Sequence, residues 1–310
     1  MSTAVAVLGE GVIDRFERTT GVQDVIGGSP LNTAVALRRA GVDSTWWNRV
    51  STDAEGQAIF DYAQLNGVAG AGVFRVPEPT SIVTVRLNEA GVPAYEFSLD
   101  GAADWGWAEA ELAGFDLPYS VLQVGSLTTA LEPGCTRLYE HLLALHSRSQ
   151  RPLVAFDPNA RPKAARDEAH ADLMRARALA IVPLADLVKV SDEDLEWLAP
   201  EAPPSATAMK WSTLGPRLVV MTKGAEGAAA FVEGVMVAEV PIHRLPLVDT
   251  VGAGDTFMAW LLRSVVVDHG VSVPVEPAAV AKMLEQAAKA AAINCSRAGC
   301  VPPTLAEVLG

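Results

Sequence analysis

Short apolar runs alternate with longer Ala-rich stretches along most of the 310-residue chain, and this alternation limits the possible folds more than any other feature of the sequence. Apolar runs bounded by Gly, Pro or Asp are typical of buried strands. Strands that alternate with helices predict a mostly parallel sheet with helices on both faces, because parallel strands need crossover connections. The strands predicted in this way are Ala4 to Leu8, Val121 to Val124, Leu153 to Phe156, Leu187 to Val190, Leu218 to Met221 and Ala228 to Val232.

One region departs from this alternation. Ser81 to Leu87 and Tyr95 to Leu99 alternate apolar and polar side chains on either side of the turn Asn88 to Gly91, which predicts an antiparallel hairpin. A half-polar hairpin inserted in a buried α/β fold is typical of a lid over a binding site. A plain surface hairpin and the edge of a dimer are the alternatives.

The composition excludes several classes of protein. Half of the residues are hydrophobic and a fifth are charged, which is enough apolar material for a large core. The 24 Lys and Arg residues against 37 Asp and Glu give a net charge of −13, which disfavours nucleic acid or an anionic membrane as a partner. An anionic ligand must therefore meet a local binding site.

The chain has no feature of a secreted, membrane or metal-cluster protein. It lacks a basic N-terminal leader, and no apolar run approaches the ~18 residues of a membrane span, so we expect a cytoplasmic protein. Cys135, Cys295 and Cys300 are an odd number at no metal-ligand spacing, which favours reduced thiols. No HExxH or CxxC motif is present, so we expect no protein-bound transition metal. The Pro- and Ala-rich segment Ala199 to Ala208 is predicted as a surface connection inside one domain that spans residues 1–310.

The most informative segment is a Gly-rich turn that runs into a predicted helix, Asp249-Thr-Val-Gly-Ala-Gly-Asp-Thr256. Small residues at Gly252, Ala253 and Gly254 let backbone N–H groups face open space at a helix N-terminus, which favours an anion such as a phosphoryl group. Asp255 in the first turn is well placed to accept a proton from an attacking hydroxyl while the amides stabilise the transferred group. An ordinary capped helix is the alternative, since Asp is favoured in a first turn.

Two other glycine motifs fail on missing residues. Gly9-Glu-Gly11-Val-Ile-Asp14 has Asp14 where a dinucleotide fingerprint needs its third glycine, which disfavours an NAD-dependent reductase. No GxxxxGK[ST] is present, so the chain is not a P-loop nucleotidase.

A second turn and helix, Gly27-Gly28-Ser-Pro-Leu-Asn32, offers groups that suit a polar sugar. Gly27 and Gly28 let a ligand approach the backbone, and Asn32 adds an amide at the start of the helix. Asp14, just after the first strand, can accept hydrogen bonds from paired hydroxyls. A helix cap for Asn32 and a plain turn for the glycines are the alternatives.

These segments together resemble the PfkB (ribokinase-type) carbohydrate kinases. The two family signatures are present in order, as Gly27-Gly28 with Asn32 and as Asp249 to Asp255, and the similarity runs from Gly9 to Thr304. Segments 156–162, 188–195 and 222–227 match between the signatures. Segments 93–105, 131–134, 157–162 and 295–304 are most similar to bacterial fructokinases.

The resemblance implies a fold and an activity. The fold is a ribokinase-like three-layer α/β/α architecture with a mostly parallel central sheet and a small β-sheet lid, drawn from about residues 11–26 and 75–105. The activity is phosphoryl transfer from ATP, with Mg²⁺, to D-fructose, which yields fructose 6-phosphate. Potassium held by carbonyls near Asp249 and the turn Ser296 to Gly299 is a further implication.

The resemblance also implies roles for individual residues. Asp255 is the general base, and the amides of Gly252, Ala253 and Gly254 form the anion hole. The sugar contacts are Asp14, Gly27, Gly28, Asn32, Phe97 and Arg161. The nucleotide contacts are Lys189, Ser191, Thr222, Lys223, Gly224, Gly227 and Asn294, and Asp194 holds Mg²⁺ through water. The alternatives are an ion pair for Arg161, a core position for Phe97 and a solvated surface position for Lys223.

The sequence departs from the family pattern in a few places. Ser191 and Asp194 replace the Asn and Glu of the NxxE pattern, although a shorter acid still binds magnesium through water. Ala102 stands where fructokinases often have Thr. A 2-keto-3-deoxygluconate kinase, another sugar kinase of the family, and a catalytically silent sugar- or nucleotide-binding protein are the alternative functions. Exposed strands at the lid edge favour a homodimer.

Overall fold

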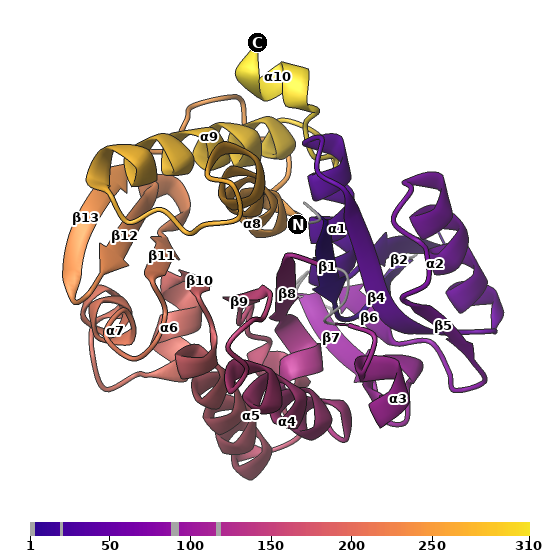
Figure 1. Ribbon diagram of the computed structural model, residues 1–310. Coiled ribbons are helices and arrows are strands. Elements are labelled where there is room, and N and C mark those ends of the chain that lie inside the picture. The colour runs from indigo at the N-terminus through magenta and orange to yellow at the C-terminus, as the bar shows by residue number, and fades with distance from the viewer. Residues whose placement is uncertain (1–3, 19–20, 88–92, 116–118) are drawn as a thin grey trace.

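Two sheets organise the computed structural model, which describes residues 4–18, 21–87, 93–115 and 119–310. The central sheet contains, in spatial order, β13 (Val235–Val240), β12 (Ala228–Val232), β11 (Leu218–Thr222), β10 (Leu187–Ser191), β9 (Leu153–Asp157), β8 (Val121–Gly125), β1 (Val5–Leu8), β4 (Ser44–Ser51) and β5 (Val73–Val76). The small sheet contains β3 (Gly21–Gly27), β2 (Val12–Arg18), β6 (Ile82–Leu87) and β7 (Pro93–Ser98). Figure 1 shows the small sheet, in indigo and magenta, at one side of the central sheet.

Helices cover both faces of the central sheet. One layer contains α1 (Ser29–Arg39), α2 (Ala54–Leu65), α8 (Ala253–Arg263), α9 (Pro277–Cys295) and α10 (Leu305–Leu309). The other contains α3 (Glu109–Leu112), α4 (Gly134–His146), α5 (Glu168–Ile181), α6 (Asp192–Leu198) and α7 (Pro204–Trp211). Short 3₁₀ turns span Ala103–Trp105 (η1), Ser126–Thr129 (η2), Pro162–Ala164 (η3), Val182–Leu184 (η4) and Gly224–Glu226 (η5), and a π-helical turn spans Ser264–Asp268.

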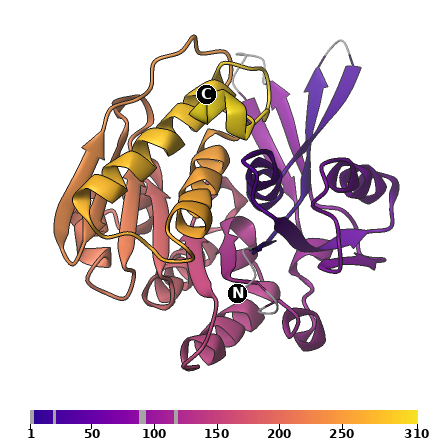
Figure 2. The same cartoon turned by 45° about the horizontal axis from the view of Figure 1, so that its top comes forward.

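Alternation along the strands divides the core into two. Val5 and Val7 of β1 pack in the core under α1, α8 and α9, whereas Ala6 and Leu8 point into the core under α4 to α7. Both sets are buried because a strand inside such a sheet is covered on both faces. Figure 2 shows α8 and α9 lying side by side on their face of the sheet. The predicted three-layer architecture is confirmed.

The strand order changes direction at β1, and this change places the candidate site. The strands from β11 to β5 are parallel, and only β12 and β13 at one edge run antiparallel to their neighbours. β1 lies between β4 and β8: the later strands β4 and β5 extend the sheet on one side of β1, and the strands from β8 onward extend it on the other side. Ligands of open α/β sheets bind at the carboxyl ends of the strands at such a point. The segment after β1 therefore lies beside the ends of β8 and β9.

The strands predicted from sequence are confirmed with small changes at their ends. β8, β9, β10 and β11 each run one residue further than predicted, and the first strand begins one residue later, at Val5. The hairpin is also confirmed, because β6 and β7 pair antiparallel with Val83 opposite Phe97. Its turn, Asn88 to Gly91, lies outside the described residues. The connection predicted at Ala199 to Ala208 is partly helical, since α7 begins at Pro204.

The small sheet is more than a hairpin. β2 pairs parallel with β6 and antiparallel with β3, which brings residues 12–27 beside residues 82–98. In the described segments, no helix is both long and apolar enough to cross a membrane.

Candidate active site

The Gly-rich turn forms the amino end of α8. Gly252 is the residue before the helix and has a left-handed backbone with φ 74°. A Cβ at this position would lie 2.2 Å from the Cys300 sulfur, so only glycine fits. Asp255 follows in the first turn and is 7 % exposed. The first N–H groups of a helix lack partners within the helix, although here the Ala253 N–H donates to the Thr250 carbonyl at 3.2 Å. The amides of Gly252 and Gly254 are therefore the stronger anion-hole candidates.

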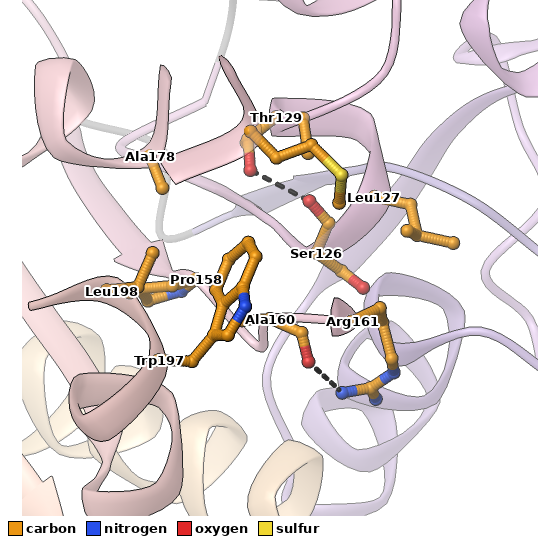
Figure 3. Close-up of a pocket in the computed structure, with 11 residues that line it drawn as sticks. Ser126, Leu127, Thr129, Pro158, Ala160, Arg161, Ala178, Trp197 and Leu198 are labelled. Atoms are coloured by element: carbon orange, nitrogen blue, oxygen red, sulfur yellow. Dashed lines mark hydrogen bonds between the residues drawn. The ribbon is translucent and has the colours of Figure 1, made fainter. Parts of the chain in front are cut away.

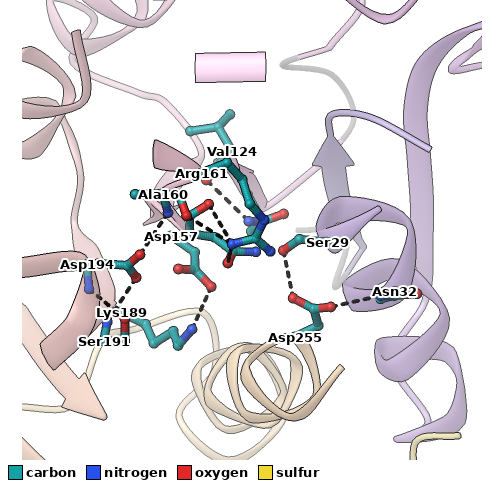
Figure 4. A network of polar contacts seen from close by, with 12 residues as sticks. Ser29, Asn32, Val124, Asp157, Ala160, Arg161, Lys189, Ser191, Asp194 and Asp255 are labelled. Carbon is teal, nitrogen blue, oxygen red and sulfur yellow. Dashed lines mark hydrogen bonds and ion pairs between the residues drawn. The ribbon is translucent and has the colours of Figure 1, made fainter. Parts of the chain in front are cut away.

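The Asp255 carboxylate is held by the start of α1. Ser29 donates its hydroxyl hydrogen to Oδ1 at 2.6 Å, and the Asn32 side-chain amide donates to Oδ2 at 2.9 Å. Figure 4 shows both side chains reaching Asp255 across the gap between α1 and α8. All three residues are buried. A carboxylate that already accepts a hydroxyl hydrogen has the geometry required of a general base for an alcohol.

These contacts decide between the two interpretations of Asn32. The residue that precedes α1 is Gly28, and Asn32 lies in the first turn, so Asn32 is not a helix cap. Its side chain instead joins the two glycine motifs, which are more than 200 residues apart in the chain (|i−j| = 223). Ser29 makes the equivalent contact and was not predicted as a site residue.

A buried ion pair lies on the other side of α8. Lys189 at β10 and Asp157 at the end of β9 approach to 2.9 Å, with their side chains 5 % and 2 % exposed. The Lys189 ammonium also lies 2.9 Å from the point where a Cβ on Gly254 would stand, so it touches the first turn of α8. The second oxygen of Asp157, Oδ1, has no partner within the described part of the chain. The pair places a positive charge beside the amides of the predicted anion hole.

Opposed effects set the charge of this pair. Burial lowers the pKa of Lys189, but the negative charges of Asp157 and Asp194 outweigh it and raise that pKa above its usual value. Burial raises the pKa of Asp157 to about 6, against the charge of Lys189. Both groups are therefore ionised at pH 7. A buried lysine that stays charged suits a polyphosphate ligand.

The segment that replaces the NxxE pattern is a helix cap in this conformation. The Asp194 N–H donates to the Ser191 hydroxyl at 2.9 Å, and the Ser191 N–H donates to Asp194 Oδ2 at 3.2 Å. The other oxygen of Asp194 accepts the Ala160 N–H at 2.8 Å, which joins the loop after β9 to α6. Ser191 and Asp194 thus lie close to Lys189, as the resemblance implies, but their polar atoms already have backbone partners (Figure 4).

The predicted nucleotide loop follows β11. Gly224 and Gly227 have positive φ angles of 48° and 100°. A Cβ on Gly227 would lie 2.1 Å from the Val240 carbonyl oxygen, whereas Gly224 faces open space. Lys223, next to Thr222, forms an ion pair with Glu239 of β13, so it is not the free surface lysine of the alternative interpretation. Gly224 is the position of this loop that a nucleotide can approach closely.

Asn294 does not fit its predicted role. The residue has no exposed surface, and its amide donates to the Val251 carbonyl at 2.7 Å. A fully buried side chain offers nothing for adenine to contact. Asn294 instead fixes the backbone directly before Gly252, and the spacing of residues along the sequence gives no sign of this burial.

The sugar-side residues gather at the root of the small sheet. A Cβ on Gly27 would lie 2.5 Å from Asp14 Oδ2, and one on Gly28 would lie 2.4 Å from the Glu10 carbonyl oxygen. The two glycines therefore allow β2 and the segment before it to approach the start of α1. Burial raises the pKa of Asp14 to about 6, and the positive charge of Arg161 opposes this shift.

Arg161 and Phe97 have different surroundings. One nitrogen of Arg161 donates to the Asn159 carbonyl, the Asn159 side chain and the Ala160 carbonyl, at 3.2, 2.6 and 3.0 Å. The residue is exposed, and no salt bridge to it is found in the described segments. Phe97 is half-buried and packs against the apolar cluster that contains Leu99, Trp105 and Leu127, which supports its interpretation as a core residue.

A small pocket opens beside Arg161 (Figure 3). Its lining is mostly apolar and comes from the ends of β8 and β9 and from α5 and α6. The lining residues are Ser126, Leu127, Thr129, Ala130, Pro158, Ala160, Arg161, Met174, Ala178, Trp197 and Leu198. Asp255 and Lys189 are absent from this lining, so the pocket is separate from the candidate phosphoryl-transfer site.

Known proteins match this chain along most of its length. The model of the pfkB family of carbohydrate kinases matches residues 2–306. A fructokinase from Rhizobium leguminosarum bv. trifolii is 34 % identical over 84 % of this chain and 79 % of its own length. Fructokinase-1 from Oryza sativa subsp. japonica is 31 % identical over 99 % of this chain and 97 % of its own.

Solved structures give the same result. The fructokinase from Xylella fastidiosa with bound ATP superposes with a TM-score of 0.86 at 24 % identity, covering 100 % of this chain and 98 % of that one. A fructokinase double mutant from Vibrio cholerae O395, in a form with fructose, ADP and potassium bound, gives a TM-score of 0.80 at 25 % identity, covering 97 % and 94 %. With the family model matching nearly the whole chain, this protein belongs to the pfkB family of carbohydrate kinases.

Proposed function

We propose that this chain is an ATP-dependent fructokinase that transfers the γ-phosphoryl group of ATP to the C6 hydroxyl of D-fructose. One observation carries the proposal. The buried Asp255 carboxylate accepts a hydroxyl hydrogen at 2.6 Å directly beside the amino end of α8. A general base and an anion-binding helix end thus meet at one point, which is what phosphoryl transfer to an alcohol requires.

The reaction follows from this geometry. The C6 hydroxyl replaces the Ser29 hydroxyl at Asp255 Oδ1, and the carboxylate takes its proton as the oxygen attacks the γ-phosphorus. The bond from that phosphorus to the bridging oxygen breaks, and ADP leaves. The amides of Gly252 and Gly254 stabilise the charge on the transferred group, and the Lys189 ammonium beside Gly254 adds a full positive charge.

Magnesium bound with ATP shields the phosphate charge during transfer. We assign Asp194 to hold it through water, since each of its oxygens keeps a lone pair beside the one given to a backbone N–H. The unpartnered Oδ1 of Asp157 is a second acceptor of the same kind. Two carboxylates fit a magnesium ion that keeps several of its waters, and no group of three or more His, Cys, Asp or Glu that could hold a metal occurs among the described residues.

A potassium site is proposed where the Gly-rich turn meets the end of α9. The N–H groups of Val248 and Asp249 donate to the Cys295 carbonyl at 2.8 and 3.1 Å, and the Gly299 N–H donates to Asp249 Oδ2 at 2.8 Å. These bonds hold two segments of backbone together, and their remaining carbonyl oxygens are the ligand type that a monovalent cation needs.

The small sheet is proposed to act as a lid of a single kinase domain. Asp14 on β2 would bind sugar hydroxyls with Asn32, Gly27, Gly28 and Arg161. Closure excludes water, which protects ATP from hydrolysis when the sugar is present. The edge strand β3 exposes Val22 and Val25, 65 % and 37 % exposed, and we propose that it pairs with a second copy in a cytoplasmic homodimer.

The test is ADP release from Mg-ATP with a panel of fructose, ribose, 2-keto-3-deoxygluconate, tagatose, glucose and adenosine. We expect strong turnover on fructose that vanishes in Asp255→Asn. Turnover on another sugar alone would keep the mechanism and replace the substrate. Silence on the whole panel by folded, ATP-binding protein would favour a silent binding protein. ATP hydrolysis without sugar should be far slower than turnover with it, and equal rates would contradict the lid.

A further inference from the structure

The chain passes between the body of the protein and the small sheet at four places, and one buried carboxylate lies beside three of them. Gly11 lies between β1 and β2, Ser81 precedes β6, and the segment after β7 leads into η1. Asp104, in η1, is 2 % exposed. It belongs to neither the base, the anion hole nor the sugar contacts described above.

Asp104 accepts hydrogen bonds from each of the neighbouring segments. Its Oδ1 accepts the Gly11 N–H at 3.2 Å and the Asn48 side-chain amide at 2.6 Å. Its Oδ2 accepts the Ser81 hydroxyl at 2.6 Å. Asn48 is on β4 of the central sheet. One side chain therefore joins these three passages to the body of the protein.

The backbone beside it repeats the connection. The Ile13 N–H donates to the Ser81 carbonyl at 3.1 Å, and the Ala103 N–H donates to the Pro79 carbonyl at 2.9 Å. The first residues of β2 and β6 thus leave the central sheet as a pair, held at their base by Asp104. The remainder of both strands extends away from this point.

Burying the charged carboxylate of Asp104 at this position costs free energy. Burial raises the pKa of Asp104 to about 6, and the neighbouring Glu10 adds to this rise while the bonds from Ser81, Asn48 and Gly11 oppose it. The group is nevertheless ionised at pH 7. An apolar group would cost less to bury, but only an ionised carboxylate accepts several charge-assisted hydrogen bonds and donates none.

The position of Asp104 bears directly on the sugar side of the site. Gly11 lies directly before β2, three residues before Asp14. A Cβ on Gly28 would lie 2.9 Å from the Gly11 Cα, so the base of β2 also touches the start of α1. A shift at Gly11 therefore changes where Asp14 lies relative to Gly28 and Asn32.

We infer that Asp104 is a positioning residue of the sugar site, which fixes the base of the small sheet and, through Gly11 and β2, the place of Asp14. The inference rests on the proposed function in one respect, the role of Asp14 as a sugar contact. The nucleotide side, on β10, β11 and α8, does not depend on it.

The main test is Asp104→Asn, with kinetics and stability measured together. The Asn side chain keeps one acceptor oxygen, but an NH2 group replaces the other oxygen, the negative charge is lost and the remaining bonds are no longer charge-assisted. We therefore expect the sugar KM to rise roughly 10- to 100-fold. The KM for ATP should change less than about twofold, because its site is built on other strands. A rise in both KM values together would overturn the inference.

Asp186→Asn is the matched control. Asp186 is 9 % exposed and accepts the Val154 N–H at 2.8 Å and two bonds from Arg151, but it lies before β10 at the opposite end of the strands. The Asp186→Asn variant should have a lower melting temperature than the wild type and an unchanged KM for the sugar. If Asp104→Asn behaves in the same way, Asp104 is only structural and the inference fails.

Hydrogen exchange supplies a measurement that does not depend on activity. Without substrates, amides of β2 and β6 should exchange faster in Asp104→Asn, with β8 to β10 unchanged, and uniform acceleration would contradict the inference.

The double variant Asn48→Asp/Asp104→Asn keeps an amide-carboxylate pair and should bring the sugar KM part of the way back to the wild-type value. If Asp104→Asn does not fold, Ser81→Ala removes one bond and should shift the same two measurements by less. A wild-type protein silent on every sugar would refute the proposed function, while the exchange pattern would still decide whether Asp104 holds the small sheet.

Discussion

The buried carboxylates on the two sides of α8 are held in opposite ways. Asp255 accepts hydrogen bonds from the neutral side chains of Ser29 and Asn32. Asp157, on the nucleotide side, is held by the charged Lys189. A substrate hydroxyl can replace the neutral Ser29 hydroxyl at Asp255, whereas the charge of Lys189 lowers the pKa of Asp157 against the larger effect of burial. Asp255 is therefore suited to proton transfer, whereas Asp157 keeps the neighbouring Lys189 positively charged.

The positive charge of Lys189 offsets an effect of the net charge of the whole chain. With a net charge of −13, the protein repels a polyphosphate at long range. Lys189 is kept charged by Asp157 and lies against the first turn of α8, so attraction is provided at short range. Five substitutions test this contrast.

Asp255→Asn should have the largest effect. The amide removes the proton acceptor while its oxygen still accepts the Ser29 hydroxyl, so we expect kcat to fall by about 10²- to 10⁴-fold with little change in folding. Turnover, nucleotide binding and the melting temperature are the measurements. Turnover close to wild type would remove Asp255 from the mechanism.

Lys189→Met should have the next largest effect on activity, and it should also lower the stability of the fold. Loss of the ammonium leaves the Asp157 carboxylate buried and unpaired, which costs about 3–5 kcal/mol of unfolding free energy. Denaturant unfolding and the KM for ATP, which should rise, are the measurements. Lys189→Met/Asp157→Asn is the control, and it should regain stability without regaining activity. If activity also returned, Lys189 would have no role at the phosphates.

Ser29→Ala and Asn32→Ala test separately the two hydrogen bonds that hold the Asp255 carboxylate. The Ser29 hydroxyl occupies the place proposed for the sugar hydroxyl, so its loss should lower kcat/KM by no more than about fivefold. Asn32 holds the other oxygen, and its loss should lower kcat/KM by roughly 10- to 100-fold. Steady-state kinetics on the sugar separates the two variants. An equal loss in both would mean that Ser29 remains bonded to Asp255 during the reaction.

Asp14→Asn should give a small change in stability that depends on the pH. Burial raises the pKa of Asp14 from 3.8 to about 6, so between these pH values the folded protein binds more protons than the unfolded chain. The contribution of Asp14 to stability therefore falls as the pH rises through this window and stays low at pH 7. The substitution should raise the melting temperature by roughly 2 °C or more at pH 7 and by nothing below pH 4, while the sugar KM rises. A lower melting temperature at pH 7 would show that the Asp14 carboxylate stabilises the fold.

Local patterns predicted much of this protein and failed at recognisable points. Short apolar runs located six of the nine strands of the central sheet, and small residues before Asp255 located the helix end, because these depend on neighbours in the chain. Ser29 and Asp104 escaped prediction because their partners are distant, with separations of 226 residues for the Ser29 bond to Asp255 and 93 for the Gly11 bond to Asp104. The S-x-x-D pattern of Ser191 and Asp194 is typical of a helix cap, so their capping bonds could have been predicted from the sequence, whereas the family resemblance implied only nucleotide and magnesium contacts.

The sulfur beneath Gly252 has a consequence for the chemical durability of the protein. Burial, with the negative charges of Asp255 and Asp249, raises the pKa of the Cys300 thiol far above its usual value. Oxidants and alkylating agents attack the thiolate, of which very little exists at neutral pH in such surroundings. We therefore expect the sulfur packed against Gly252 to react slowly, and the proposed anion hole to stay intact under oxidising conditions that inactivate enzymes with reactive cysteines.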